Sequence, residues 1–206
     1  MSEFPLSGIS LLRMATDGEG VTALVCAQGC PLRCDMCINP HTLENRKVPY
    51  VSPEKLLEMV KPHSLYYIAT GGGITFGGGE PLLRAAFIRD FTAICPPEWK
   101  INAETCLNVP EENVRIAAEC VQHFFVDIKD MNPEIYRAYT GRDNEAVYGN
   151  LRLLIALVGS ERVTVRVPLI PGFNTPEDNE YSEKLLRGMG YTRFDRFEYT
   201  DKRKGT

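Results

Sequence analysis

Short apolar segments that fit buried strands alternate with amphipathic segments along this chain, and this order limits the possible folds most. The expected strands cover residues 21–27, 73–76, 99–104, 124–128, 163–167 and 194–199. The expected helices cover residues 53–60, 82–94, 110–120, 133–139, 147–157 and 176–189. Repeated strand–helix units of this kind predict an α/β fold with buried parallel strands. About six units fit, fewer than the eight of a complete barrel, so we predict a partial parallel β/α barrel.

No internal repeat, low-complexity run or linker interrupts this order, and we expect one domain over residues 1–206. The chain is 44% apolar, enough to fold around its own core. Its net charge of −4 argues against a surface that coats nucleic acid, and the basic cluster Lys202-Arg203-Lys204 fits a solvated terminus. We find no basic leader and no apolar run long enough for a bilayer. We therefore expect a cytoplasmic monomer with no nucleic-acid or membrane partner.

Three cysteines stand close together after the first expected strand: Cys30, Cys34 and Cys37. The chain has seven cysteines, an odd number that excludes a complete set of internal disulfides, so reduced thiols and a metal site are expected. Four-cysteine sites fill an iron–sulfur cluster or a zinc ion completely, whereas three leave a metal position open for chemistry. The other four cysteines are expected to be inert residues in apolar surroundings, namely Cys26, Cys95, Cys106 and Cys120.

Polar residues stand where the expected strands end, which is where parallel α/β folds place their sites. Glu80 follows the second strand, and Glu104 ends the third. Asp127 and Lys129 share one face at the end of the fourth strand, and Arg166 lies in the fifth. A charge on a buried strand costs on the order of several kcal/mol unless it is paired or bound to something. One such residue alone would fit a fraying strand end, but the set indicates a site.

A glycine segment, Gly77-Gly78-Gly79, separates the second expected strand from Glu80. Glycine permits positive φ and a close approach of the backbone to a ligand. A lone glycine run is often only a turn. Directly after a strand, however, its backbone groups are placed to hold the zwitterionic end of an amino-acid-like cofactor.

A second interpretation is a non-enzymatic zinc-binding module, because Cys37 and His41 have zinc-finger-like spacing and a Cys₃His site closes a zinc tetrahedron. The three cysteines are spaced more tightly than in the usual finger of this type. This interpretation also leaves the glycine segment and the strand-end charges unexplained. Metal analysis separates the two, since a cluster brings about four irons and a finger one zinc.

Together these residues resemble the radical S-adenosylmethionine (SAM) superfamily, and more narrowly the activating enzymes of glycyl radical enzymes, of the pyruvate formate-lyase activating type. The cysteine triplet matches the superfamily signature, and Gly78-Gly79-Glu80 matches its second motif. The resemblance spans about residues 16–199 and includes the stretches 29–34, 37–40, 127–132, 139–141 and 166–172. This ordered set is more specific than the triplet alone.

The resemblance implies a radical SAM type of partial barrel with a [4Fe–4S] cluster on Cys30, Cys34 and Cys37. SAM would chelate the fourth iron, and Lys129 would be catalytic together with the three cysteines. The implied cofactor-binding residues are Met36, Ile38, Gly78, Gly79, Glu80, Glu104, Asp127, Lys129 and Arg166. Met36 would lie beside adenine, the two glycines would meet the methionine amino group, and Glu80 would brace their loop.

A monovalent cation is implied near Glu104, Thr105 and Asp127. Here Glu104-Thr105-Cys106-Leu107 replaces the Asp-Thr-Asn-Gly of the family, a departure at that site. No cysteine lies between Cys37 and the glycine segment, so we expect one cluster.

The resemblance implies an oxidoreductase that cleaves SAM reductively and generates a glycyl radical on a partner glycyl radical enzyme. Flavodoxin or ferredoxin would be the electron donor. The alternative keeps the cofactors and changes the substrate to a small molecule, a peptide or an anaerobic ribonucleotide reductase. The stretches 127–132 and 166–172 favour the activating enzyme. Residues 42–50 are a candidate docking segment for the partner and equally a plain polar loop.

Overall fold

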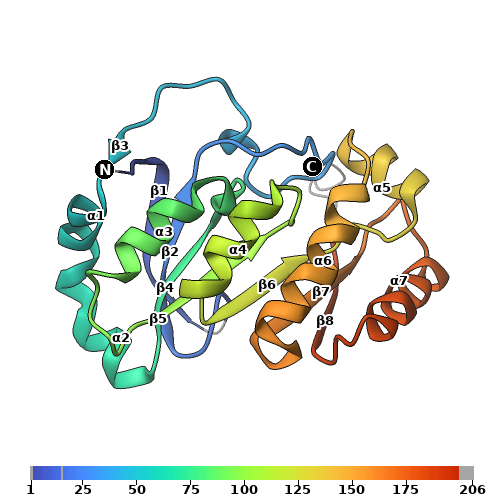
Figure 1. Ribbon diagram of the computed structural model, residues 1–206. Coiled ribbons are helices and arrows are strands. Elements are labelled where there is room, and N and C mark those ends of the chain that lie inside the picture. The colour runs from blue at the N-terminus through green and yellow to red at the C-terminus, as the bar shows by residue number, and fades with distance from the viewer. Residues whose placement is uncertain (1, 15, 200–206) are drawn as a thin grey trace.

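The strands of this computed structural model, which describes residues 2–14 and 16–199, form one sheet (Figure 1). The strand order is β3-β1-β2-β4-β5-β6-β7-β8. The basic cluster of residues 202–204 lies outside the described residues.

Six neighbouring strands of the sheet are parallel and follow one another in chain order. They are β2 (Val21–Ala27), β4 (Gly73–Gly78), β5 (Lys100–Thr105), β6 (His123–Asp127), β7 (Val163–Leu169) and β8 (Phe194–Glu198). The register pairs Cys26 with Gly77 and Asp127 with Arg166. The predicted α/β fold and its six parallel strands are confirmed, with boundaries shifted by at most two residues.

Two strands at one edge of the sheet were not predicted. β1 (Phe4–Met14) pairs antiparallel with β2, and β3 (Tyr50–Val51) pairs antiparallel with the start of β1. The pairing of β1 shifts register between Leu6 and Gly8 and again between Ser10 and Arg13. These irregularities break the alternation of apolar and polar residues that identifies a strand in a sequence.

Six of the helices lie close to their expected positions. They are α1 (Pro53–Val60), α3 (Ala85–Thr92), α4 (Glu111–Cys120), α5 (Pro133–Thr140), α6 (Glu145–Val158) and α7 (Pro176–Gly188). The hydroxyl of Ser52 caps α1 by accepting from the Lys55 amide, and Pro53 occupies the first turn, as the sequence predicts. The expected helix over 82–94 instead begins with a 3₁₀ turn, Pro81–Arg84.

Helix α2 (Ser64–Thr70) was missed because aromatic and β-branched residues in its short sequence give a weak helical signal. The helices cover one face of the sheet, and Figure 1 shows α3, α4 and α6 side by side over the strands. In the described part of the chain, no helix is long and apolar enough to cross a membrane.

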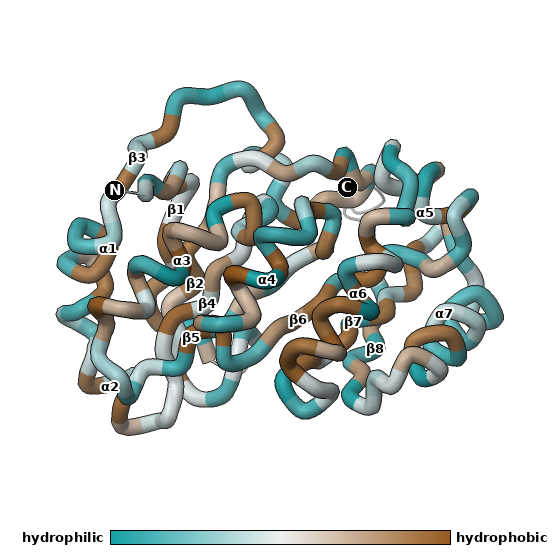
Figure 2. The backbone as a smooth tube through the Cα atoms, in the orientation of Figure 1, coloured by the Kyte–Doolittle hydropathy of each residue, from teal (hydrophilic) through white to brown (hydrophobic). Residues whose placement is uncertain are grey.

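The two faces of the sheet differ in chemistry. Side chains under the helices are apolar and buried, such as Val25, Phe76, Val126 and Val165. Figure 2 shows apolar residues concentrated in the strands and along one side of the helices. The alternate strand residues face the inner side and include Asn102, His123, Thr164 and Arg166. Because the helices pack only on the outer face, the inner face is available for polar chemistry.

The turn between β1 and β2 folds across the inner face. The carbonyl of Asp17 accepts a hydrogen bond from the hydroxyl of Thr75 on β4. Arg166 Nη2 donates to the carbonyl of Thr16 at 2.9 Å. The turn therefore divides the inner face into an upper part, at the carboxyl ends of the strands, and a lower part at their amino ends.

Candidate active site

The cysteine loop, residues 28–39, leaves the carboxyl end of β2 and is fixed by backbone hydrogen bonds. The amide of Gly29 donates to the carbonyl of Thr42 at 2.8 Å, and the amide of Glu80 donates to the carbonyl of Gly29 at 2.9 Å. The amide of Cys37 donates to the carbonyl of Cys34 at 3.2 Å. These bonds tie the loop to the end of β4 and to the segment that follows the cysteines.

The carboxyl end of helix α5 holds the middle of the cysteine loop. The amide of Arg33 donates to the carbonyl of Thr140 at 2.9 Å, and the amide of Asp35 donates to the carbonyl of Tyr139 at 3.1 Å. The last carbonyls of a helix have no partner within the helix, so they are free to accept such bonds. The stretch 139–141, which carries part of the family resemblance, therefore holds the cysteine loop in position.

Cys30, Cys34 and Cys37 are free, half-buried thiols that line one wall of a single cavity of about 340 Å³, the site pocket. Burial raises the pKa of Cys34 to about 11 and also raises that of Cys37. Among the described residues, no three His, Cys, Asp or Glu side chains are grouped to hold one metal ion. A cubane cluster, in contrast, takes its cysteines on different irons. His41 does not line this cavity.

The other walls of the site pocket carry all but one of the residues that the sequence assigned to the site. Met36, Ile38, Gly78, Gly79, Glu104, Asp127, Lys129 and Arg166 line it together with the cysteines. Ile38 is 71% exposed, so it forms part of the rim. Residues separated by up to 136 positions of sequence, from Cys30 to Arg166, thus meet because parallel strands bring their carboxyl ends to one edge.

The remaining predicted residue, Glu80, lies behind the pocket wall and is buried. Its carboxylate accepts hydrogen bonds from the amide of Leu82 at 3.0 Å, the hydroxyl of Thr105 at 2.8 Å and the amide of Cys106 at 2.8 Å. Burial raises the pKa of Glu80, and these donors oppose that shift. Glu80 therefore joins the ends of β4 and β5, and the hydroxyl of Thr105 is directed to Glu80.

Gly78 and Gly79 lie tightly against the start of the cysteine loop. Gly78 has a φ of +87°, in the region that favours glycine. A Cβ on Gly78 would meet the Cβ of Cys26 at 2.6 Å, and one on Gly79 would meet the carbonyl oxygen of Gly29 at 2.1 Å. Both positions therefore require glycine for the backbone of β4 to reach the cysteine loop.

Lys129 is buried between two oxygen atoms. Its Nζ lies 3.4 Å from Asp127 Oδ2 and donates to the hydroxyl of Tyr199 at 3.0 Å. Burial alone lowers the pKa of Lys129, but Asp127, Tyr199 and Cys34 raise it well above its ordinary value. The ammonium is therefore positively charged beside the cysteines.

Arg166 connects the carboxylates of neighbouring strands. Its Nη1 lies 2.7 Å from Glu104 Oε1 and 3.8 Å from Asp127 Oδ1, and its Nε lies 3.7 Å from Asp195 Oδ2. Burial lowers the pKa of Arg166, but Asp127 and Glu104 outweigh burial and raise it. The arginine thus lies between the two carboxylates proposed above for a monovalent cation.

Cys106 is buried in the hydrophobic core, as we expected, but it also lines the site pocket. Its thiol forms hydrogen bonds with Cys30 and Glu80, and these contacts together with burial raise its pKa well above the ordinary value. The hydrogen bond from Cys106 lowers the pKa of Cys30. Cys120 is buried, and Cys95 is half-buried against the core, as predicted.

Sequence reasoning missed several residues of the site pocket, including Arg13, Asp17, Tyr139 and Tyr199. Tyr199 directly follows the sixth parallel strand, so the strand-end rule that selected Asp127 and Lys129 also points to it. Arg13 and Asp17 pair with each other at the β1–β2 turn. No signal indicated them, because β1 itself was not recognised.

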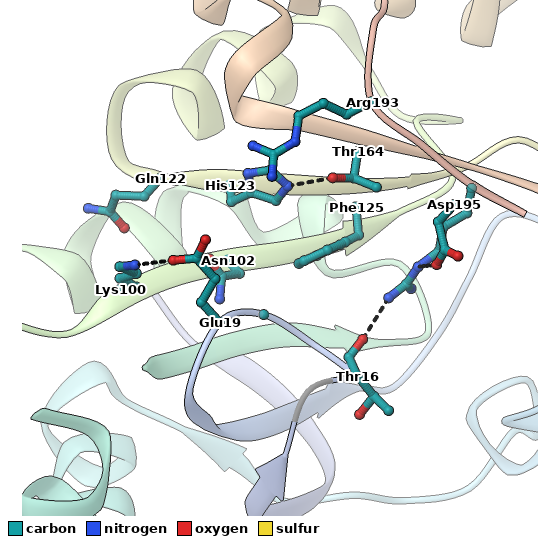
Figure 3. Close-up of a pocket in the computed structure, with 12 residues that line it drawn as sticks. Thr16, Glu19, Lys100, Asn102, Gln122, His123, Phe125, Thr164, Arg193 and Asp195 are labelled. Carbon is teal, nitrogen blue, oxygen red and sulfur yellow. Dashed lines mark hydrogen bonds and ion pairs between the residues drawn. The ribbon is translucent and has the colours of Figure 1, made fainter. Parts of the chain in front are cut away.

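A second cavity, of about 390 Å³, lies on the lower part of the inner face (Figure 3). It shares Thr16 and Arg166 with the site pocket. Figure 3 shows Lys100 facing Glu19 and His123 facing Thr164, with a His123 Nε2 to Thr164 Oγ1 distance of 2.9 Å. Burial and the neighbouring Arg193 lower the pKa of His123 to about 4, so its ring is neutral at pH 7.

The fold is a partial barrel of six parallel strands, with three cysteines and a glycine segment at the carboxyl edge of the sheet. These features together indicate the class of protein. The sequence model of the Radical SAM superfamily matches residues 24–183, and the chain belongs to this superfamily. Membership implies a [4Fe–4S] cluster and SAM as cofactors. It also removes the support for a non-enzymatic zinc module.

The chain is similar to curated activating enzymes. It is 28% identical over 181 residues to the pyruvate formate-lyase 1-activating enzyme of Escherichia coli, covering 84% of this chain and 72% of that protein. It is 29% identical to the choline trimethylamine-lyase activating enzyme of Oleidesulfovibrio alaskensis, covering 84% and 73%. It is 37% identical over 129 residues to the isethionate sulfite-lyase activating enzyme of Desulfovibrio desulfuricans. This match covers 61% of this chain but only 39% of that enzyme.

Solved structures support the fold. Streptococcus suis SuiB bound to its precursor peptide superposes with a TM-score of 0.67 at 11% identity, over 86% of this chain and 39% of that one. TYW1 superposes with a TM-score of 0.62 at 14% identity, over 88% and 66%. These likenesses establish the partial barrel and carry no information on the substrate.

The residues present fit the implied cofactors. Three thiols on one wall supply three cluster ligands and leave one iron for another donor. In the same pocket, the glycine backbone and Lys129 offer polar groups to an amino acid, with Asp127 and Arg166 nearby. The tight packing of Gly78 and Gly79 keeps this side of the pocket free of side chains.

Proposed function

We propose that this chain is the activating enzyme of a glycyl radical enzyme. The observation that carries the proposal is the convergence of the three cysteines, the glycine segment and the Asp127–Lys129–Arg166 charges on one pocket. The curated relatives reported above, which are activating enzymes for different lyases, support the same conclusion. They favour this function over action on a small molecule, a peptide or an anaerobic ribonucleotide reductase.

Cys30, Cys34 and Cys37 would hold a [4Fe–4S] cluster, and this cluster together with SAM would supply the radical chemistry that removes a hydrogen atom from a glycine of the partner. Lys129 orients an anionic group of SAM, because its ammonium is held at a fixed place by Asp127 and Tyr199. Arg166 contributes a second fixed positive charge. Glu80 keeps the glycine segment in position without entering the pocket.

Three finer points belong to the same proposal. A monovalent cation would bind beside Glu104 and Asp127, where it would share these carboxylates with Arg166. Flavodoxin or ferredoxin would donate the electron. The enzyme would act as a cytoplasmic monomer on its protein substrate.

The test is to reconstitute the cluster anaerobically, reduce it, and add SAM together with candidate glycyl radical enzymes encoded near the gene. The expected result is a glycyl radical doublet by electron paramagnetic resonance, with one 5′-deoxyadenosine formed per radical. SAM cleavage without a radical on any of these partners, but with a small-molecule product, would contradict the proposal.

A further inference from the structure

A second hollow, of about 500 Å³, lies between the cysteine loop and the segment 42–50. It is lined by Gln28, Cys30, Arg33, Arg46, Lys47 and Arg84, among other residues. Cys30 lines both this basic hollow and the site pocket. One proposed cluster ligand is therefore shared by the two cavities, so the hollow reaches the position of the cluster.

The basic hollow is strongly positive. Its lining includes Arg33, Arg46, Lys47 and Arg84, all exposed, against the single carboxylate of Glu44. In the part of the chain that the structure describes, none of these four cations forms an ion pair. The whole chain, in contrast, carries a net charge of −4. An unpaired positive surface on an acidic protein attracts a negative partner at long range.

Hydrogen bonds hold this surface in place. Arg33 Nη1 donates to the carbonyls of Cys30 at 2.7 Å and Leu32 at 2.8 Å. Arg46 Nη2 donates to the hydroxyl of Ser7 at 2.7 Å. Gln28 Nε2 donates to the carbonyl of Glu44 at 2.8 Å and so ties the segment 42–50 to the cysteine loop.

That segment is the outer arch in Figures 1 and 2, where residues 44–47 are coloured as hydrophilic. The guanidinium groups of Arg33 and Arg46 are bound to backbone or hydroxyl oxygens and keep further N–H groups for a partner. A surface that is already ordered loses less entropy when a partner binds.

We propose that the basic hollow is the docking surface of an acidic one-electron carrier protein, an inference that rests on the proposed function. Each SAM cleavage consumes one electron, and in the proposed function SAM and the partner's glycine occupy the site pocket. The electron then enters most directly through the other cavity that Cys30 lines. The carrier is oxidised by one electron and the cluster is reduced by one, and no bond or proton is exchanged.

A partner glycyl radical enzyme fits this surface less well, because its glycine has to enter the site pocket, which is a different cavity. A small redox-inert anion such as phosphate would satisfy the charges but would deliver no electron. The segment 42–50, which the sequence suggested for docking the enzyme substrate, is thereby assigned to the reductant.

The test measures cluster reduction by stopped-flow absorbance, with reduced flavodoxin and reduced ferredoxin as separate probes and dithionite as a small reductant that needs no docking. The variant is Arg46→Glu/Lys47→Glu. The matched control, Arg152→Glu/Lys184→Glu, makes the same charge change at exposed positions on α6 and α7. We expect at least about a tenfold slower reduction of the variant by flavodoxin or ferredoxin, a weaker salt dependence, and wild-type rates with dithionite.

Equal rates for the variant and the wild type with both carriers would overturn the proposal. It would also be overturned if the variant accepted carrier electrons normally but lost glycyl radical formation under dithionite, because the hollow would then bind the enzyme substrate. Glycyl radical formation by the wild-type protein with dithionite tests the proposed function without any carrier protein. Its failure would contradict the proposed function, whereas equal carrier rates would contradict only the docking surface.

Discussion

Glu80 Oε1 lies 2.8 Å from the hydroxyl of Thr105, and this buried hydrogen bond joins the carboxyl end of β4 to that of β5. It fixes the glycine segment from behind, at a place where the front of the segment faces the cysteines.

Replacing Glu80 with alanine should destabilise the protein. The change leaves the amides of Leu82 and Cys106 and the hydroxyl of Thr105 buried without their acceptor, which costs on the order of 3 kcal/mol. Urea unfolding followed by circular dichroism measures the loss. Glu112→Ala on α4 is the control, since Glu112 is exposed and should change stability by less than about 0.5 kcal/mol. Equal stability of the two variants would show that Glu80 does not brace the loop.

Replacing Gly79 with alanine should weaken SAM binding by at least about tenfold, because the new Cβ would lie 2.1 Å from the carbonyl of Gly29 and push the glycine segment away from the cysteine loop. Equilibrium binding of SAM to the cluster-loaded protein is the measurement. Gly149→Ala in α6 is the matched control, since a Cβ there meets no atom within 4 Å. This control should gain about 0.5–1 kcal/mol of stability and bind SAM normally. Unchanged SAM affinity of the Gly79 variant would refute the close approach.

Replacing Cys34 with alanine should abolish both the iron–sulfur absorbance and SAM cleavage, because two thiols cannot hold the cluster in this pocket. Iron analysis and the yield of 5′-deoxyadenosine are the measurements. Cys95→Ala should keep both properties, since Cys95 does not line the site pocket. SAM cleavage by the Cys34 variant at the wild-type rate would remove the basis of the proposed function.

His123 should make the folded state less stable as the pH falls. Its pKa is lowered to about 4 by burial, below the ordinary value of 6.5, so between these values the unfolded chain binds a proton that the folded chain does not. Stability therefore rises with pH through this window and is lost as pH falls from 6.5 to 4. The effect is on the order of 1 kcal/mol, because solvent reaches the half-buried ring and screens it.

The measurement is the difference in unfolding free energy between pH 7 and pH 5, compared between the wild type and His123→Gln. The variant should lose less stability over this interval, since its side chain does not titrate. An identical pH dependence in both proteins would show that His123 is not held neutral.

The parallel strands were predictable because they are apolar on the face that the helices cover and because polar residues stand at or near several of their carboxyl ends. Cys30, Glu80, Glu104 and Asp127 could be placed at one edge from this pattern alone, since parallel strands share their carboxyl edge. Strand β1 could not be predicted, because its register shifts interrupt the alternation of apolar and polar residues that identifies a strand. The hydrogen bonding of Cys106 to Cys30 was equally hidden, since a cysteine after a strand has no signal that separates a core residue from a neighbour of the site.

The order of the sheet also determines when the site pocket is completed during synthesis. β2 and the cysteine loop leave the ribosome early, and each later parallel strand is added beside the one before it. Lys129, Tyr139, Arg166 and Tyr199, which close the pocket, all come from the second half of the chain. Because chains fold from the N-terminal end as they are made, the three thiols remain accessible until these residues arrive.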